Sequence, residues 1–381
     1  MIYLDSAATT AVRREVLEAM WPYLTGEFGN PSSHHELGES AKSALDTARA
    51  EIARILGCRA SEIIFTSGGT ESDNLAIKGI ALATPRGRHI VTTAIEHEAV
   101  LESCRYLERH HGFEITIVGV DADGLVSVAE IAAAFRPDTT LCTVMLANNE
   151  MGAVQPIEEI VRAAQDFGIP VHTDAVQAAG WLPLDVGGLG IHALSISGHK
   201  LGAPKGIGAL YVRGGIPLEP LIHGGGQERG RRSGTENVAS AVGLASALRI
   251  ADTTRAVNAE RVTALRDAFI RDVLSAVPSA VLTGPVGDRL PASASFCFPG
   301  TSGESILLEL GRSGIVCSAG SACAVGDDDP SHVLIAMGIE PDVAQTAVRF
   351  GLGAESSEAE LRQVVSEIAA AVAAVRGLGS S

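Results

Sequence analysis

The chain has 381 residues, of which 46% are hydrophobic and 42 are glycines, enough for one large α/β core and a second, smaller domain. Its formal net charge of −16, from 29 Lys+Arg against 45 Asp+Glu, offers no basic surface for phosphate backbones and disfavours direct nucleic-acid binding. No apolar run could span a bilayer and the first residues lack a signal-peptide pattern, so we expect a cytoplasmic protein.

Up to about residue 250, compact apolar runs alternate with longer amphipathic stretches. This alternation is typical of α/β proteins with a mainly parallel sheet, in which ligand sites gather where strands end and loops begin. We expect helices between the strands. The predicted strands are Glu62–Thr66, His89–Thr93, Glu114–Val118, Thr139–Met145, Pro170–Thr173, Ala193–Ile196 and Gly208–Val212.

Two candidate site elements follow the first two strands. Residues 67–71, with the sequence SGGTE, form a Gly-Gly turn before a helix. Backbone N–H groups and the positive helix end can cradle a phosphate there, although such turns also simply start helices. His97 could stack on an aromatic cofactor and move protons near neutral pH, but a single histidine is more often a packing residue.

A carboxylate and a lysine follow two later strands. Asp174 could pair with a protonated pyridine nitrogen, with Gln177 near a phenolic oxygen, or it could simply be a helix N-cap. Lys200, in the sequence SISGHK at 195–200, stands at a strand-to-loop exit, where a partly desolvated amine can form a Schiff base. A lysine considered alone is more often solvated. The presence of Asp174 after a neighbouring strand favours the Schiff-base role for Lys200 instead.

After about residue 250 the pattern predicts a separate C-terminal domain, with a helix over Ile250–Val277 and a strand over Leu290–Phe298. A capping box, Ser357 with Glu360, opens the last helix. One face of that helix is apolar, which favours core packing over partner binding. This face carries Leu361, Val364, Val365, Ile368, Val372 and Val375.

The six cysteines lack CxxC spacing, which favours reduced thiols over a disulfide framework and leaves room for one working thiol. Cys323 is the candidate, because residues 317–330 (CSAGSACAVGDDDP) are small, polar and rich in turn formers, typical of a mobile loop. The alternative is a small buried hydrophobe. Cys317 follows an apolar run and is expected to pack, and its C-x₅-C spacing with Cys323 is a poor zinc signature, so no metal is expected.

Together these pieces resemble the cysteine desulfurases of the class V, fold type I enzymes that use pyridoxal 5′-phosphate (PLP). The shared sequences are GGTE at 68–71, EH at 96–97, NNE at 148–150, TDAVQ at 173–177 and SGHK at 197–200, in the family's order. The resemblance extends from YLDSAATT at 3–10 to VRF at 348–350. It implies a large domain (15–255) around a mainly parallel seven-stranded sheet, and a smaller α/β domain (1–14 and 256–381).

The resemblance implies the roles of residues around the cofactor ring. Lys200 would hold PLP through a Schiff base, and Asp174 would pair with the pyridinium nitrogen. Gln177 would meet the phenolic oxygen, His97 would stack on the ring and serve in catalysis, and Asn149 would lie beside cofactor and substrate.

It also implies the residues around the phosphate. Gly69 and Thr70 in the turn, with Ser197 and His199 before the lysine, would bind this group. Thr235, in the sequence RRSGT at 231–235, would reach the phosphate of a neighbouring subunit. A homodimer follows from that resemblance.

The implied activity converts L-cysteine to L-alanine and leaves the sulfur as a persulfide on catalytic Cys323. The loop matches the longer form of the group I branch, although the aspartates Asp327, Asp328 and Asp329 put the thiolate pKa and the acceptor in question, because negative charge disfavours a thiolate. Arg349 matches the family arginine that grips the substrate carboxylate; otherwise it is a surface arginine.

The sulfur would pass to an acceptor protein for iron–sulfur cluster assembly, tRNA thiolation, cofactor biosynthesis or DNA phosphorothioation. The sequence does not separate these destinations. Alternatives on the same scaffold are a selenocysteine lyase, another class V lyase or an aminotransferase. A PLP-binding docking scaffold with little turnover is the alternative from a different class of protein.

Overall fold

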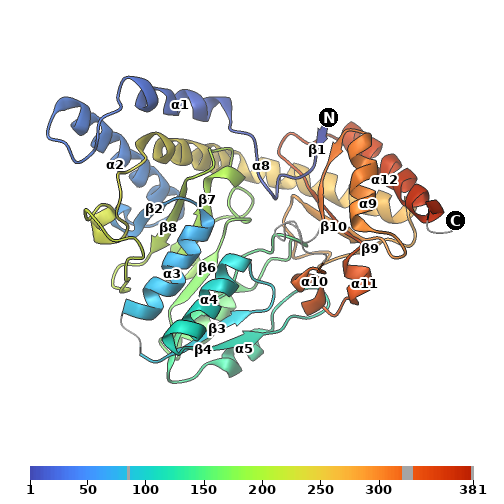
Figure 1. Cartoon of the computed structure of the whole chain (residues 1–381), viewed down its shortest axis with the longest axis horizontal. Coiled ribbons are helices and arrows are strands. Elements are labelled where there is room, and N and C mark those ends of the chain that lie inside the picture. The colour runs from blue at the N-terminus through green and yellow to red at the C-terminus, as the bar shows by residue number, and fades with distance from the viewer. Residues whose placement is uncertain (84–85, 320–328, 379–381) are drawn as a thin grey trace.

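The computed structural model describes residues 1–83, 86–319 and 329–378. Figure 1 shows two lobes, a larger one around an extended sheet and a smaller one that holds both ends of the chain. The α/β fold with a mainly parallel seven-stranded sheet, predicted from the sequence, is confirmed. Within the described ranges, no helix is long and apolar enough to cross a membrane.

The large sheet has the strand order β2-β8-β7-β6-β5-β3-β4. The five strands from β7 to β4 in this order run parallel, and β8 runs antiparallel to both of its neighbours. The seven predicted strands are present, with ends that differ by at most two residues. They are β2 (Ile63–Thr66), β3 (His89–Thr93), β4 (Glu114–Val118), β5 (Thr139–Thr143), β6 (Val171–Asp174), β7 (Ala193–Ser197) and β8 (Gly208–Val212).

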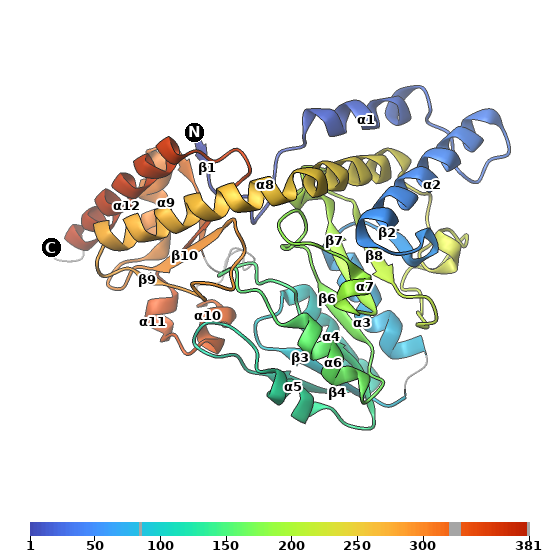
Figure 2. The ribbon, with the colours of Figure 1, turned by 180° about the vertical axis from the view of Figure 1, so that it is seen from behind.

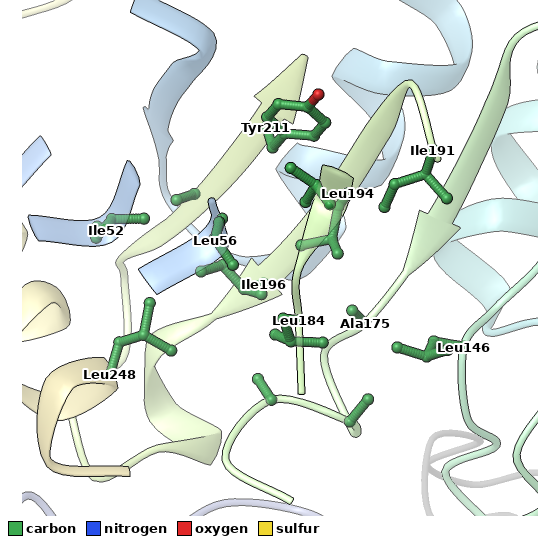
Figure 3. Packing of buried hydrophobic residues seen from close by; sticks show 14 of the residues in the cluster. Ile52, Leu56, Leu146, Ala175, Leu184, Ile191, Leu194, Ile196, Tyr211 and Leu248 are labelled. Carbon is green, nitrogen blue, oxygen red and sulfur yellow. The ribbon is translucent and has the colours of Figure 1, made fainter. Parts of the chain in front are cut away.

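Alternate side chains of the sheet enter two different cores, as the two-residue period of a strand requires. Leu194 and Ile196 of β7 pack with Leu56 of α2 and Leu248 of α8, a cluster seen in Figure 3. Ala193 belongs to the opposite core, under α3 and α4. The helices of the larger lobe are α1 (Arg14–Thr25), α2 (Glu36–Leu56), α3 (Gly69–Ala83), α4 (Glu98–His111), α5 (Val128–Ala134), α6 (Ile157–Gln165) and α7 (Val186–Leu189).

The smaller lobe has its own core around an antiparallel sheet of order β12-β13-β10-β9. Fully buried Phe296 and Phe350 pack with Phe269 at ring-centroid distances of 6.2 and 5.4 Å. In a separate two-stranded sheet, β1 (Ile2–Tyr3) pairs in parallel with β11 (Ile315–Val316). The other elements are β9 (Val281–Leu282), β10 (Ser293–Cys297), β12 (Ser318–Ala319), β13 (Ala347–Gly351), α9 (Gly303–Arg312), α10 (His332–Ala336), α11 (Pro341–Ala344) and α12 (Glu358–Leu378).

The long helix α8 (Val238–Ala276) crosses from one lobe to the other (Figure 2). The sequence predicted its start at Ile250, which is wrong: the helix begins twelve residues earlier, capped by Asn237, whose side chain accepts from Ser240 N at 3.1 Å. Leu244 and Leu248 belong to the core of the larger lobe, and Phe269 belongs to that of the smaller. Because one helix serves both cores, the domain division at residue 255 stays a prediction.

The last helix agrees with its sequence pattern. Ser357 N donates to Glu360 Oε2 at 3.1 Å, and Glu360 N donates to Ser357 Oγ at 3.4 Å, so the capping box is formed. Leu361, Val364 and Ile368 are buried in the core of the smaller lobe. The expected core-packing role of this helix is confirmed.

Candidate active site

The predicted lysine and carboxylate lie at the same edge of the large sheet. Asp174 ends β6, and the register pairs it with Ser195 of the parallel strand β7. Lys200 follows β7 through a single turn of 3₁₀-helix, Gly198–Lys200. Because the carboxyl ends of parallel strands share one edge, the two side chains are brought together.

Asp174 is the buried acid of this site. Its Oδ1 accepts from Val176 N at 2.8 Å, and the side chain is 7% exposed. Burial raises the pKa of Asp174, while the Val176 bond and the positive charges of His97 and Lys200 act in the opposite direction. Asp174 therefore interacts electrostatically with His97 and Lys200, two of the three residues that the sequence singled out for catalysis.

His97 stands at the start of α4 and caps that helix. Its Nδ1 accepts a hydrogen bond from Ala99 N at 3.0 Å. This bond fixes the ring orientation and assigns Nδ1 the acceptor role, so that a proton on the neutral ring resides on Nε2. His97 also lies close enough to buried Asp174 for a positive charge on its ring to lower the pKa of that carboxyl group.

The Gly-Gly turn approaches β7 closely at the start of α3. A Cβ on Gly69 would lie 2.8 Å from Val176 Cγ2 and 3.6 Å from Ser197 Cβ, and one on Gly208 would lie 2.7 Å from the Gly68 backbone. Side chains at these glycines would fill the space. The turn and Ser197 thus form a narrow cradle at the N-terminus of a 15-residue helix.

His199 immediately precedes Lys200 in the chain and is half-buried. Burial, followed by the charges of Lys200 and Lys205, lowers the pKa of His199 to about 4, so its ring is neutral at pH 7. Its Nδ1 lies 3.2 Å from Thr9 Oγ1. A neutral imidazole can bind a phosphate by donating a hydrogen bond, without adding a charge.

The N-terminal segment covers the site, a feature that the sequence reasoning missed. Lys200 Nζ donates to the carbonyl oxygens of Ala7 and, at 2.7 Å, of Ala8. Gln177 Nε2 donates to Ala7 O at 3.0 Å, and Thr10 Oγ1 donates to His199 O at 2.8 Å. The only signal in the sequence was the run of small and polar residues before the first helix.

Arg349, on β13 of the smaller lobe, joins the site across the lobe boundary. Its Nη1 donates to Asn149 O at 3.0 Å and its Nη2 to Asp5 Oδ1 at 3.1 Å. The guanidinium is nearly buried, and within the described part of the chain its Nε has no partner. A cavity of about 480 Å³ is lined by Asn149, to which Arg349 is bonded, and by Ala7, Gln177 and Lys200, among others. The predicted substrate residues Asn149 and Arg349 are therefore neighbours.

Glu150 belongs to the NNE motif at 148–150, and the sequence predicted no role for it. Its side chain is buried, and Oε2 accepts from Ser331 Oγ at 2.5 Å. Burial raises the pKa of Glu150 to about 7, although the Ser331 hydrogen bond and the charges of Arg349 and His97 oppose this. A carboxyl group that titrates near neutral pH thus lies within the field of two site residues.

Two predicted residues of the described ranges, Thr70 and Thr235, stand apart from this constellation. Thr70 is exposed in the first turn of α3, with its carbonyl bonded to Asn74. Thr235 is exposed, and its hydroxyl makes no hydrogen bond within the described ranges. Cys323 lies outside the described residues, as do Asp327 and Asp328.

The residues present fit PLP. The cradle at Gly69 and Ser197 suits a phosphate, and the buried carboxyl of Asp174 suits a protonated ring nitrogen. Lys200 lies at the same edge to attach the aldehyde carbon. The donor set therefore covers both ends of the cofactor.

Comparisons with known proteins agree with this geometry. Residues 2–364 match the family model for aminotransferase class-V. Cysteine desulfurase IscS of Dictyoglomus turgidum is 48% identical over 361 residues, covering 94% of this chain and 91% of that protein. A solved NifS-like protein has a TM-score of 0.91 and 38% identity, covering 98% of this chain and 99% of that one. The structure of SspA in complex with cysteine has a TM-score of 0.81 and 38% identity over 92% of this chain and 99% of that one.

Proposed function

We propose a mechanism from the premise that this chain belongs to the aminotransferase class-V family and is a PLP-dependent cysteine desulfurase. Such an enzyme converts L-cysteine to L-alanine and transfers the sulfur. One observation carries the proposed site: Lys200, Asp174 and His97 converge at one sheet edge, with buried Asp174 in the field of both others. A similar protein, SspA, has been solved with cysteine bound, which supports L-cysteine as the substrate.

The cofactor site uses the residues at the carboxyl edge of the sheet. When bound, PLP supplies an electron-withdrawing ring that stabilises the electron pair released at the substrate Cα. Asp174 would hold a negative charge against the ring nitrogen, and Gln177 would bond the phenolic oxygen. Gly69, Thr70, Ser197 and His199 would bind the phosphate.

Lys200 and His97 move protons in this mechanism. The Lys200 amine would remove the proton from the substrate Cα and return one later. His97 would take the proton from the substrate thiol; because Nε2 carries the proton of the neutral ring, the accepting atom is Nδ1, which must first release its hydrogen bond from Ala99 N. Asn149 and Arg349 hold the substrate carboxylate, the latter through its planar fork.

The sulfur step needs a thiolate on the enzyme. Cys323 attacks the substrate sulfur; the S–S bond forms as the C–S bond breaks, and the carbon skeleton keeps that electron pair, gains a proton and leaves as L-alanine. Burial, followed by Asp5, raises the pKa of Cys317 to about 12, so that neighbouring thiol stays protonated. A protonated thiol is a poor nucleophile, which disfavours Cys317 as the sulfur carrier.

The test compares Cys323→Ser with the matched control Cys317→Ser. We expect Cys323→Ser to retain the PLP absorbance but to form no persulfide, and no sulfide from L-cysteine with a reductant. Cys317→Ser should retain both. Sulfide production at the wild-type rate by Cys323→Ser would refute the role of this cysteine, and a much higher turnover of selenocysteine than of cysteine would point to a lyase of that substrate instead.

The proposed enzyme is a homodimer in which Thr235 reaches the phosphate site of the second subunit. An exposed apolar stripe on and after α1 supports an interface: Leu17, Trp21, Leu24 and Phe28 are each more than half exposed. The spacing of Leu17, Trp21 and Leu24 places these three along one side of α1, and Phe28 follows the helix. Trp21→Glu should shift the wild-type dimer toward monomer in sedimentation velocity, and an unchanged sedimentation coefficient would exclude this stripe from the interface.

The persulfide sulfur is proposed to pass to an acceptor protein in the cytoplasm. The described cysteines are free thiols, as expected in a reducing compartment. Iron–sulfur cluster assembly, tRNA thiolation and DNA phosphorothioation are the candidate destinations. Trapping the persulfidated enzyme in its native extract, and identifying the protein that removes the sulfur, distinguishes them.

A further inference from the structure

The segment between β8 and α8 contains two strained residues. Glu228 and Arg229 have φ angles of +49° and +59°, the left-handed region, and in the described part of the chain no other residue besides glycine does. Side chains with a Cβ adopt this region at a cost in free energy. Two such residues in succession persist only when the surroundings fix them, and such strain is concentrated at functional sites.

A buried ion pair fixes this strained turn to α2. Arg49 Nη1 and Nη2 donate to Glu228 Oε2 and Oε1 at 2.6 and 2.7 Å. Both side chains are almost fully buried, and the Arg49 guanidinium lies 4.7 Å from the centre of the Phe65 ring. A bidentate pair constrains orientation as well as distance, so Glu228 has one available position.

The same carboxylate and its neighbour connect the turn to β2. Phe65 N donates to Glu228 Oε2 at 3.2 Å. Arg49 Nη1 and Arg229 Nη2 both donate to Ile63 O, at 2.9 and 2.6 Å. The turn is therefore attached to the strand that leads into the phosphate cradle.

A second ion pair connects the segment to the cradle itself. Arg232 Nε donates to Glu71 Oε1 at 2.8 Å, and Ser67 N donates to Glu71 Oε2 at 2.8 Å. Burial alone would raise the pKa of Glu71, yet the hydrogen bonds from Arg232 and Ser67 lower it below its ordinary value. Segment 226–235 is thus bonded to turn 67–71 through Arg232 and Glu71, and to the preceding strand β2 through Glu228 and Arg229.

We propose that the Arg49–Glu228 pair is a positioning element for the cofactor phosphate. It holds segment 226–235 in place, so that the phosphate cradle at Gly69 and the Thr235 that would reach the second subunit keep fixed positions. This rests on the proposed function, in which Thr235 serves a second copy of this chain. Neither Arg49 nor Glu228 touches the phosphate. They act through Arg232, Glu71 and the rigid turn.

Stability alone does not explain the pair. A buried ion pair gains little over an apolar pair of similar volume, because two charges lose their hydration. What an apolar pair cannot supply is a fixed direction for Glu228, and the strained turn depends on that direction. Loss of the pair should therefore affect phosphate recognition more than folding.

The test compares PLP with pyridoxal, which forms the same covalent bond to Lys200 but lacks the phosphate. Arg49→Lys keeps the charge opposite Glu228 and removes the bidentate grip. We expect the preference of the apoenzyme for PLP over pyridoxal to fall on the order of tenfold, with pyridoxal affinity within about twofold of wild type. Amide hydrogen exchange across 226–235 should accelerate on the order of tenfold as well.

The matched control is Glu51→Gln, which breaks the largely exposed Arg54–Glu51 pair on the same helix. It should leave the phosphate preference and the exchange rates at wild-type values. The double variant Arg49→Met/Glu228→Leu fills the same volume without charges and should fold. It is expected to lose the preference as Arg49→Lys does.

Folded variants with wild-type phosphate preference and wild-type exchange in 226–235 would overturn the positioning role. If the double variant fails to fold, Arg49→Lys alone decides between the two outcomes. Failure of the proposed function has a different signature: the wild-type protein itself would bind no PLP, release no sulfide from L-cysteine or sediment as a monomer.

Discussion

Arg349 and Asp5 lie 344 residues apart in the sequence and are joined by a 3.1 Å bond from the guanidinium to the carboxylate, at the meeting point of the two lobes. The same guanidinium bonds Asn149 O, so its orientation is set from the N-terminal segment and from a turn of the larger lobe. A substrate carboxylate that approaches Arg349 meets a fork that is already oriented.

Arg349→Lys should therefore raise KM for L-cysteine by about tenfold to a hundredfold, because a lysine cannot make the two parallel bonds of the fork. The cofactor absorbance should be unchanged. Steady-state kinetics measures the effect, with the exposed Arg362→Lys as control. A wild-type KM in Arg349→Lys would remove this residue from the substrate site.

Lys200→Ala should abolish the absorbance of covalently attached PLP, because only a primary amine at this position can form the Schiff base. Lys205, exposed five residues further on, gives the control: Lys205→Ala should retain full absorbance. Both spectra are recorded after reconstitution with excess PLP and gel filtration. Stable covalent absorbance in Lys200→Ala would place the attachment elsewhere.

Glu150 should make the enzyme less stable at alkaline pH. Burial raises its folded-state pKa from 4.5 to about 7, so its contribution to stability is full below pH 4.5 and is lost as pH rises through 7. Glu150→Gln keeps an oxygen for Ser331 and does not titrate. Relative to wild type, it should gain up to about 3 kcal/mol between pH 5 and pH 8.

Thermal unfolding of both proteins at the two pH values measures this gain. Other buried acids, such as Glu96, titrate alike in both proteins and cancel in the difference. A melting-temperature difference between Glu150→Gln and wild type that is the same at pH 5 and pH 8 would show that Glu150 is ionised at both.

The core of the smaller lobe should be sensitive to a single aromatic side chain. Phe350→Leu removes the edge contacts of Phe350 with Phe269 and Phe296 and leaves a partly filled space. We expect a loss of about 1–3 kcal/mol. Urea unfolding measures it, with Leu308→Ala at an exposed position as a control near zero. A loss as small as that of the control would mean that the core closes around the change.

The strands and the lysine edge were predictable because their signals are local. Ala193–Ile196 reads as a strand since its side chains are apolar on both faces, and the parallel order then places Lys200 beside Asp174. The same local reasoning placed the capping box at Ser357 correctly. Periodicity and turn chemistry act within a few residues, so a sequence displays them directly.

The start of α8 was missed because its first turns resemble a loop. Residues 238–247 are mostly alanine, glycine and serine, which give no amphipathic period. Their small size is what lets α1 and α2 pack closely: a Cβ on Gly243 would lie 2.6 Å from Met20 Sδ. Tertiary packing, not periodicity, fixed this boundary.

Contacts between distant segments were equally hidden. Ser331 lies 181 residues from Glu150, and Arg49 lies 179 from Glu228. Serine, glutamate and arginine are residue types that usually lie at the protein surface. Only the folded chain shows that these charges are buried, and burial gives them their energetic weight.

The pairing of β1 with β11 has a consequence for biosynthesis. Ile2 and Tyr3 pair with Ile315 and Val316, so the segment before α1 can take its final place only when residues 315 and 316 have been translated. The Ala7 carbonyl that accepts from Lys200 and the Asp5 carboxylate that accepts from Arg349 belong to this same N-terminal segment. The segment over Lys200 is thus anchored by a pairing between residues that lie more than 300 positions apart, and such non-local contacts form slowly.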